Sequence, residues 1–287
     1  MDIGIGLPTT IPGTEGRTLV DWARHAEEAG VSTLGTIGRL VYPNYEELIA
    51  LSAAAAVTSR IRLTTSVLLA PFYTNSALLA KQAASLDRLS GGRLVLGMAV
   101  GGREDDFTAS GVSMSGRGHR LEEQVALMKR IWSGEEFGTA GGIGPEPARS
   151  GGPQIILGGS SEASFRRVAR IADGWIMGGG APDMFAQAAA SVDQAWQEAG
   201  RPGRPRKLTL AYFGLGTEAR SQAEGYLLHY YAWLGDIANM IAGSAAVSPE
   251  MVKSYVAAFE ASGCDEIIWV PTAARLDQVS LLAEAIA

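Results

Sequence analysis

Short apolar runs alternate with amphipathic segments from one end of the chain to the other. Short apolar runs bounded by Gly, Pro and polar residues are typical of buried strands, and the amphipathic segments have helical spacing. The pattern predicts eight strands: Asp2–Leu7, Ser32–Ile37, Ile61–Leu69, Leu94–Val100, Gln154–Leu157, Gly174–Met177, Leu208–Phe213 and Glu266–Val270. It places helical segments between them at Arg17–Ala29, Tyr45–Ser59, Ser76–Leu89, Arg117–Trp132, Ser161–Ile171, Pro182–Ala199, Glu218–Ala261 and Leu276–Ala287.

This regular alternation predicts an α/β fold with a parallel sheet. Eight strands, each followed by helix, are most simply a closed (β/α)8 TIM barrel, and an open doubly wound sheet is the alternative. The Gly- and Pro-rich stretch from Gly138 to Pro153 is expected to be an exposed loop within one domain, residues 1–287, because the alternation resumes directly after it.

Composition argues against several classes of function. The chain has 287 residues and a net charge of -6, with no dense Lys/Arg stripe, so nucleic acid is not an expected partner. No apolar run is long enough to predict a membrane span, and the N-terminus lacks a signal-like segment. Cys264 is the single cysteine, which excludes an internal disulfide and fits a cytoplasmic location.

The active residues of TIM barrels follow the strands, at their carboxyl ends. None of the four lysines ends a predicted strand, which argues against Schiff-base chemistry, and the three histidines lie in or beside predicted helices, which argues against a metal hydrolase. His229 in particular is expected to pack within its helix. The strand ends are instead rich in glycine, hydroxyls and arginine, a composition that suits a large cofactor with its own chemistry.

The strongest local signal for a binding site is the turn that joins a strand to a helix at Gly158, Gly159, Ser160 and Ser161. Backbone N–H groups in such a turn can hold a phosphate, although an ordinary serine-capped helix has the same sequence.

Arg103 and Arg39 are candidate anion contacts, with surface ion pairing as the alternative for each. The tyrosines Tyr73, Tyr212 and Tyr230 are predicted mainly to pack in the core.

Four stretches in this order are similar to the bacterial luciferase-like superfamily of flavin-dependent oxidoreductases. They read IRLTTSVLLAPF, LLAKQAASLDRLSGGRLVLGMAVGGREDDF, RGHRLEEQVALMKRIWSGE and PQIILGGSSEASFRRVARIADGWI. The resemblance implies a TIM barrel that forms a homodimer and binds a flavin or deazaflavin at the carboxyl end of the barrel. It implies an oxidoreductase, either a monooxygenase or a reductase or dehydrogenase, that acts on a small molecule.

The resemblance also implies residue roles. A cis peptide beneath the flavin ring would fall at Ser66–Val67. The implied cofactor-binding residues are Thr65, Ser66, Val67, Arg103, Gly158, Gly159, Ser160 and Ser161. The substrate is expected beside Arg39, Tyr42 and Tyr73, and small residues from Ala53 to Ala56 are expected to allow close helix packing in the dimer.

One departure leaves the catalytic residue unassigned. Many members carry an acidic residue and a histidine after the second strand, where this chain has Arg39 and Leu40. The short chain and the segment GGSSEASFRRVARIADGWI, Gly158–Ile176, resemble the deazaflavin-using branch of the family, which favours coenzyme F-420, and FMN is the other expected cofactor. Two alternatives stay open: a non-catalytic flavin-binding relative and a cofactor-free sugar-phosphate barrel enzyme.

Overall fold

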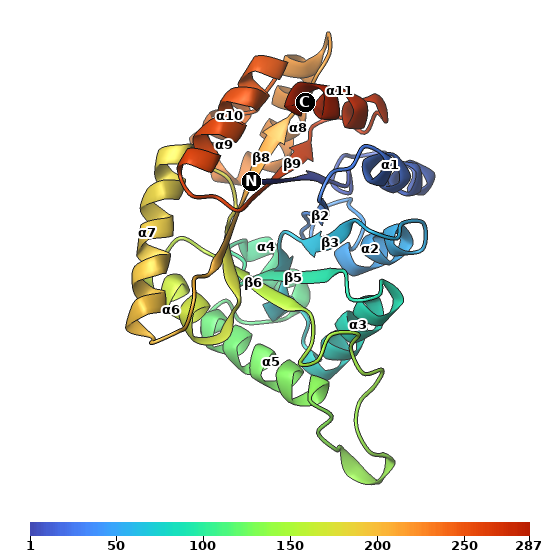
Figure 1. The fold of residues 1–287 in the computed structure, drawn as a ribbon, viewed down its shortest axis with the longest axis vertical. Coiled ribbons are helices and arrows are strands. Elements are labelled where there is room, and N and C mark those ends of the chain that lie inside the picture. The colour runs from blue at the N-terminus through green and yellow to red at the C-terminus, as the bar shows by residue number, and fades with distance from the viewer.

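The chain folds into a closed barrel of parallel strands surrounded by helices (Figure 1). A computed structural model describes all residues from 1 to 287. The strands follow the order β3-β2-β1-β9-β8-β7-β6-β5-β4, and β3 also pairs with β5, which closes the ring. The prediction of a closed (β/α)8 barrel is therefore confirmed, and the alternative of an open doubly wound sheet is wrong, because β3 pairs with both β2 and β5 and so closes the ring.

The predicted elements appear close to their expected bounds. The strands are β1 Asp2–Gly6, β2 Thr33–Thr36, β3 Arg62–Thr65, β4 Leu68–Leu69, β5 Leu94–Ala99, β6 Gln154–Gly158, β7 Gly174–Met177, β8 Arg206–Phe213 and β9 Glu266–Pro271. The α-helices are α1 Gly16–Glu28, α2 Glu47–Ala55, α3 Ser76–Leu89, α4 Glu104–Ser110, α5 Arg117–Trp132, α6 Glu162–Ile171, α7 Pro182–Glu198, α8 Ala219–Tyr230, α9 Asp236–Gly243, α10 Pro249–Ala261 and α11 Asp277–Ile286. Short 3-10 turns are η1 Ala70–Phe72, η2 Gly138–Ala140 and η3 Ala232–Leu234.

Alternation along each strand produces two apolar layers. In β5, Val95 belongs to the cluster inside the barrel, whereas Leu94 and Leu96 belong to the cluster beneath the helices. Strands buried on both faces read as continuous apolar runs, which is the pattern that predicted them. Each fully buried aliphatic side chain contributes roughly 1.5–3 kcal/mol, so these layers supply most of the folding free energy.

The predicted helical zone from Glu218 to Ala261 is wrong as one unit, and α4 was not predicted. After α8, Gly235 has a φ of 57°, a left-handed conformation that interrupts the helix. Ala246 then pairs with Phe213 at the end of β8, and the side chain of Ser248 caps α10. Apolar periodicity continues through this zone, but Gly235, Gly243 and the Ser248-Pro249 pair were available signals of the breaks, and the prediction did not use them.

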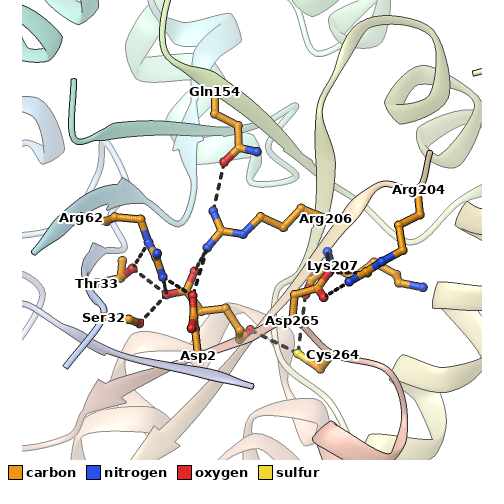
Figure 2. Close-up of polar contacts among 11 residues, drawn as sticks. Asp2, Ser32, Thr33, Arg62, Gln154, Arg204, Arg206, Lys207, Cys264 and Asp265 are labelled. Carbon is orange, nitrogen blue, oxygen red and sulfur yellow. Dashed lines mark hydrogen bonds and ion pairs between the residues drawn. The ribbon is translucent and has the colours of Figure 1, made fainter. Parts of the chain in front are cut away.

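A polar network closes the amino-terminal end of the barrel (Figure 2). Its centre is the fully buried carboxylate of Glu266 at the start of β9. Arg206 donates to Oε2 at 2.5 Å, and Arg62 donates to Oε1 at 3.1 Å. The hydroxyls of Ser32 and Thr33 also donate to Oε1. Because β2, β3 and β8 contribute donors to a carboxylate on β9, the network ties the ring together below its apolar interior.

No helix is long and apolar enough to cross a lipid bilayer.

Replacing Glu266 by Ala should lower the free energy of unfolding by roughly 3–5 kcal/mol, because two arginines would lose their buried partner. Urea denaturation at neutral pH measures this change. The control is Glu284→Ala on the exposed side of α11, which should stay within about 0.5 kcal/mol of the wild type. A loss below about 1 kcal/mol for Glu266→Ala would show that the network does not hold the barrel together.

Candidate functional site

The third barrel strand is interrupted at the carboxyl end of the ring. β3 ends at Thr65, the peptide between Ser66 and Val67 is cis, and β4 resumes beside Met98 and Ala99 of β5. The cis bond lies at the place that the resemblance implied. Gly97 of β5 faces this interruption, and a Cβ there would collide with the carbonyl oxygen of Thr65. Glycine at this position therefore lets the two strands approach closely.

A cavity with a volume of about 830 Å³ lies at this end, above β4, β5, β6 and β7. We call it the glycine-lined cavity. Its predicted lining residues are Ser66, Val67, Gly158, Gly159 and Ser160, which the structure brings together. Further apolar walls come from residues that the sequence analysis did not single out, namely Phe165, Trp175, Met177, Met184 and Trp233. The volume lies within the range of small-molecule and cofactor sites.

Glycines leave room for a ligand on two sides of this cavity. A Cβ built on Gly102, Gly178 or Gly179 would meet nothing within 4 Å, so backbone is exposed to open space there. At Gly159 the φ is 136° and a Cβ would collide with Ser164, so this turn requires glycine. The turn precedes α6, whose N-terminus favours an anion.

Three of the predicted cofactor residues do not reach the glycine-lined cavity. Thr65 is fully buried and donates from Oγ1 to the carbonyl oxygen of Gly97 at 2.7 Å. Ser161 caps α6, where its Oγ accepts from the amide of Ser164 at 3.2 Å. Both side chains therefore have structural partners where the sequence predicted ligand contacts.

Arg103 forms the ion pair that the sequence analysis gave as its alternative role. It is 7% exposed and lies 2.5 Å from Asp105 and 3.2 Å from Asp106. Its guanidinium carbon also lies 4.8 Å from the ring centroid of Trp233, which lines the cavity. Arg103 thus borders the cavity through Trp233. The prediction missed Trp233 because this tryptophan lies in the turn that interrupts the supposed long helix.

A second cavity, of about 370 Å³, lies beside the first, and we call it the side cavity. Its lining includes Arg39, Tyr42 and Tyr73, the three residues expected beside a substrate. Leu69 lines both cavities and is their shared wall. The guanidinium of Arg39 lies 4.8 Å from the ring centroid of Tyr42, and the phenol of Tyr73 donates to Glu46 at 2.6 Å.

The side cavity contains a buried carboxyl that sequence reasoning missed. Glu47 is the first residue of α2, is 7% exposed, and lines the cavity. Burial raises the pKa of Glu47 to about 7; its own backbone amide opposes the rise, while the charges of Glu46 and Asp106 add to it. Two adjacent glutamates at the start of the helix after the second strand were the available signal.

Neighbouring groups have shifted pKa values for related reasons. Burial raises the pKa of Asp106, although its hydrogen bond from the amide of Val41 and the charge of Arg103 oppose the rise. Burial also raises the pKa of Tyr73, and the charges of Glu47 and Glu46 act in the same direction. These groups make the side cavity the more polar of the two sites.

The remaining residues considered in the sequence analysis, two tyrosines and a histidine, lie near the carboxyl end of the barrel. Tyr212 and Tyr230 are buried, as expected of core residues, and Tyr212 shares a 2.6 Å hydrogen bond with the hydroxyl of Tyr231. His229 lies exposed on α8, with its Nδ1 2.8 Å from the hydroxyl of Tyr42. His229 therefore contacts the side cavity indirectly.

Comparison with known proteins places the chain in a family. A family model described as luciferase-like monooxygenase matches residues 1–280. An uncharacterised protein of Mycobacterium tuberculosis is 35% identical over 165 residues, which are 55% of this chain and 57% of that protein. An FMNH(2)-dependent dimethylsulfone monooxygenase of Pseudomonas putida is 25% identical over 224 residues, which are 72% of this chain and 60% of that protein. The matches span less than two thirds of either relative.

A solved structure supports the same fold. An F420-dependent secondary alcohol dehydrogenase, in complex with an F420-acetone adduct, superposes with a TM-score of 0.81. Sequence identity is 14%, and the superposition covers 100% of this chain and 99% of that chain. Related proteins therefore include one that uses reduced FMN and, at the level of the fold, one that uses F420.

Proposed function

The chain belongs to the family of luciferase-like monooxygenases, and we propose that it is a flavin- or deazaflavin-dependent oxidoreductase acting on a small organic substrate. The observation that carries the proposal is the glycine-lined cavity above β4 to β7. It has room for a ring system, exposed backbone at its rim, and a helix N-terminus beside it.

The residues of this cavity fit a flavin-like group that carries a phosphate. The Oγ of Ser66 is buried there without a hydrogen-bond partner, which leaves a polar atom for a ligand. The backbone from Gly158 to Ser160 would hold the phosphate at the start of α6. Trp175 stabilises this turn, because its Nε1 donates to the carbonyl oxygen of Gly159 at 2.8 Å.

The chemistry of the reaction would come from the cofactor, and the chain would position it. When bound, a reduced flavin or deazaflavin supplies a hydride, and reduced FMN can also activate oxygen. Ser66 and Val67 would support the ring from the barrel side, while Met184 and Trp233 would exclude water from the opposite side. Arg39, Tyr42 and Tyr73 would bind the substrate beyond Leu69.

The proposed cofactor is coenzyme F-420, with FMN as the second candidate. The short chain and the resemblance of the segment Gly158–Ile176 to the deazaflavin-using branch support F-420, and the Pseudomonas putida relative supports FMN. A deazaflavin would restrict the protein to hydride transfer because it reacts poorly with oxygen.

We propose a cytoplasmic location, which fits a single cysteine, Cys264, that is buried and free.

Replacing Gly178 by Asp should weaken cofactor binding at least about tenfold, because the new carboxylate would occupy the cavity and repel a phosphate. Gly178 has open space and an ordinary φ, so the change should not disturb the backbone. Absorbance and fluorescence titrations with FMN and F-420 measure the affinity. The matched control is Gly225→Asp on α8, which lies outside the cavity and should bind as the wild type does. Failure of the wild type to bind either cofactor would overturn the proposed function, and wild-type affinity in Gly178→Asp would overturn the cavity assignment.

We also propose a homodimer formed through α2. Ile49, Ala53 and Ala56 lie one helical turn apart and are exposed, and Ile49 is 65% exposed. Leu78 of the neighbouring α3 extends this apolar surface. Such a surface is expected to bury itself against a second copy.

Light scattering of the purified protein should give the mass of a dimer, and Ile49→Glu should shift it toward the monomer by placing a charge in the interface. Met240→Glu is the matched control, because Met240 is a similarly exposed apolar residue on the distant helix α9. A monomeric wild type, or an equal effect of both substitutions, would contradict the assignment to α2.

A further inference from the structure

The side cavity presents buried polar atoms that have no partner in the protein. The Nε of Arg39 and the Oδ1 of Asn44 are both buried without a hydrogen bond, and both residues line the cavity. Buried polar groups are normally paired, because an unpaired one costs roughly 1–3 kcal/mol. Two such groups around one cavity point to a polar ligand that pairs with them.

Glu47 lies against the same cavity and also lacks a partner from another residue. Its carboxyl packs directly on Gly38, so closely that a Cβ at that position would collide with Oε1 of Glu47. The hydrogen bond assigned to this carboxyl comes from its own backbone amide. Glu46, the adjacent carboxylate, is by contrast fully engaged, since it accepts from Tyr73 and from the amide of Ile49.

We propose that Glu47 is the catalytic residue that exchanges a proton with the substrate in the side cavity. The inference rests on the proposed function, because it assigns a role at the substrate side of that site. The ligand chemistry is a small alcohol or carbonyl compound. Its oxygen would lie between Glu47 and Arg39, and its apolar body would contact Leu69 and Phe72, which also line the cavity.

The proton transfer balances without any further reactant. When the substrate oxygen gains negative charge during reduction, the O–H bond of Glu47 breaks and an O–H bond forms on that oxygen. The reduced cofactor of the proposed function supplies the hydride, and Glu47 becomes a carboxylate that solvent protonates again. In the oxidative direction the carboxylate accepts the hydroxyl proton of an alcohol, and the oxidised cofactor of the proposed function would accept the hydride.

The surroundings of Glu47 suit this exchange near neutral pH. With a pKa of about 7, the carboxyl is mostly protonated at pH 6 and mostly ionised at pH 8. The titratable or charged groups that act on it or share its cavity come from several elements: Glu46, Asp106, Tyr73, Tyr230 and Arg39. Arg39 is itself paired with Asp105, at 3.3 Å, so its charge is partly balanced.

Labelling with dicyclohexylcarbodiimide tests the protonation and accessibility of Glu47 without cofactor or substrate. This reagent is an apolar probe that reacts with protonated carboxyls. Peptide mass spectrometry should locate the label on Glu47 in the wild type, with a rate about tenfold lower at pH 8 than at pH 6. Glu47→Gln should lose this label, and Glu46 is the internal control that should stay unlabelled. Absence of label on Glu47, or a rate independent of pH, would overturn the proposal.

Turnover then tests the role itself, with F-420 as the cofactor and acetone and 2-propanol as the substrate probes. Glu47→Gln should lower kcat by about 100-fold or more and remove the pH dependence near pH 7, while Glu47→Asp should restore part of both. Affinity for the cofactor should stay unchanged, because Glu47 lies outside the glycine-lined cavity. Wild-type kcat and pH profile in Glu47→Gln would overturn the proposal.

Failure of the proposed function has a different signature. A wild type that binds neither cofactor refutes the proposed function, and the labelling result still decides whether Glu47 is a protonated carboxyl open to the side cavity. If the wild type turns over substrate, and Glu47→Gln binds the cofactor and turns over at the same rate, the role of Glu47 alone is refuted.

Discussion

The pairing of β5 with both parts of the third strand is the constraint on which the rest of the structure depends. β5 pairs with β3 near the base of the barrel and with β4 at its carboxyl end, so one strand both closes the ring and carries it past the interruption at Ser66 and Val67. The pairing of β3 with β5 closes the ring, and the interruption places Ser66 and Val67 against the large cavity. A glycine at position 97 is what permits the close approach of these strands.

The amino-terminal end of the barrel contributes to stability, and the carboxyl end contains the proposed site. The carboxylate of Glu266 and two arginines seal the amino-terminal end, where no cavity-lining residue of the proposed site lies. The carboxyl end instead contains buried polar atoms without partners, such as the Oγ of Ser66 and the Nε of Arg39, which are costly unless a ligand meets them. It also has glycine backbone that is open to a ligand. This arrangement agrees with the general division of TIM barrels into a stable face and an active face.

The sequence predicted the fold well because each barrel strand is a local apolar run and each helix has its own periodicity. It also predicted the glycine-lined cavity in part, since Gly158, Gly159 and Ser160 follow directly from a strand-to-helix turn. Glu47 could not be recognised in the same way. Its proton affinity depends on burial and on Asp106, which is 59 residues away in sequence but packed nearby in space.

The partition between the two cavities is thin. Leu69 is the one residue that lines both, and it stands at the end of the two-residue strand β4, outside the continuous part of the barrel wall. A substrate in the side cavity would have to reach the cofactor past this side chain, so a smaller residue there would widen the passage without touching either the glycine rim or the polar groups around Arg39. A single substitution at Leu69 could therefore change the length of substrate that the barrel accepts. Related barrels could evolve between compact and extended substrates by such a change.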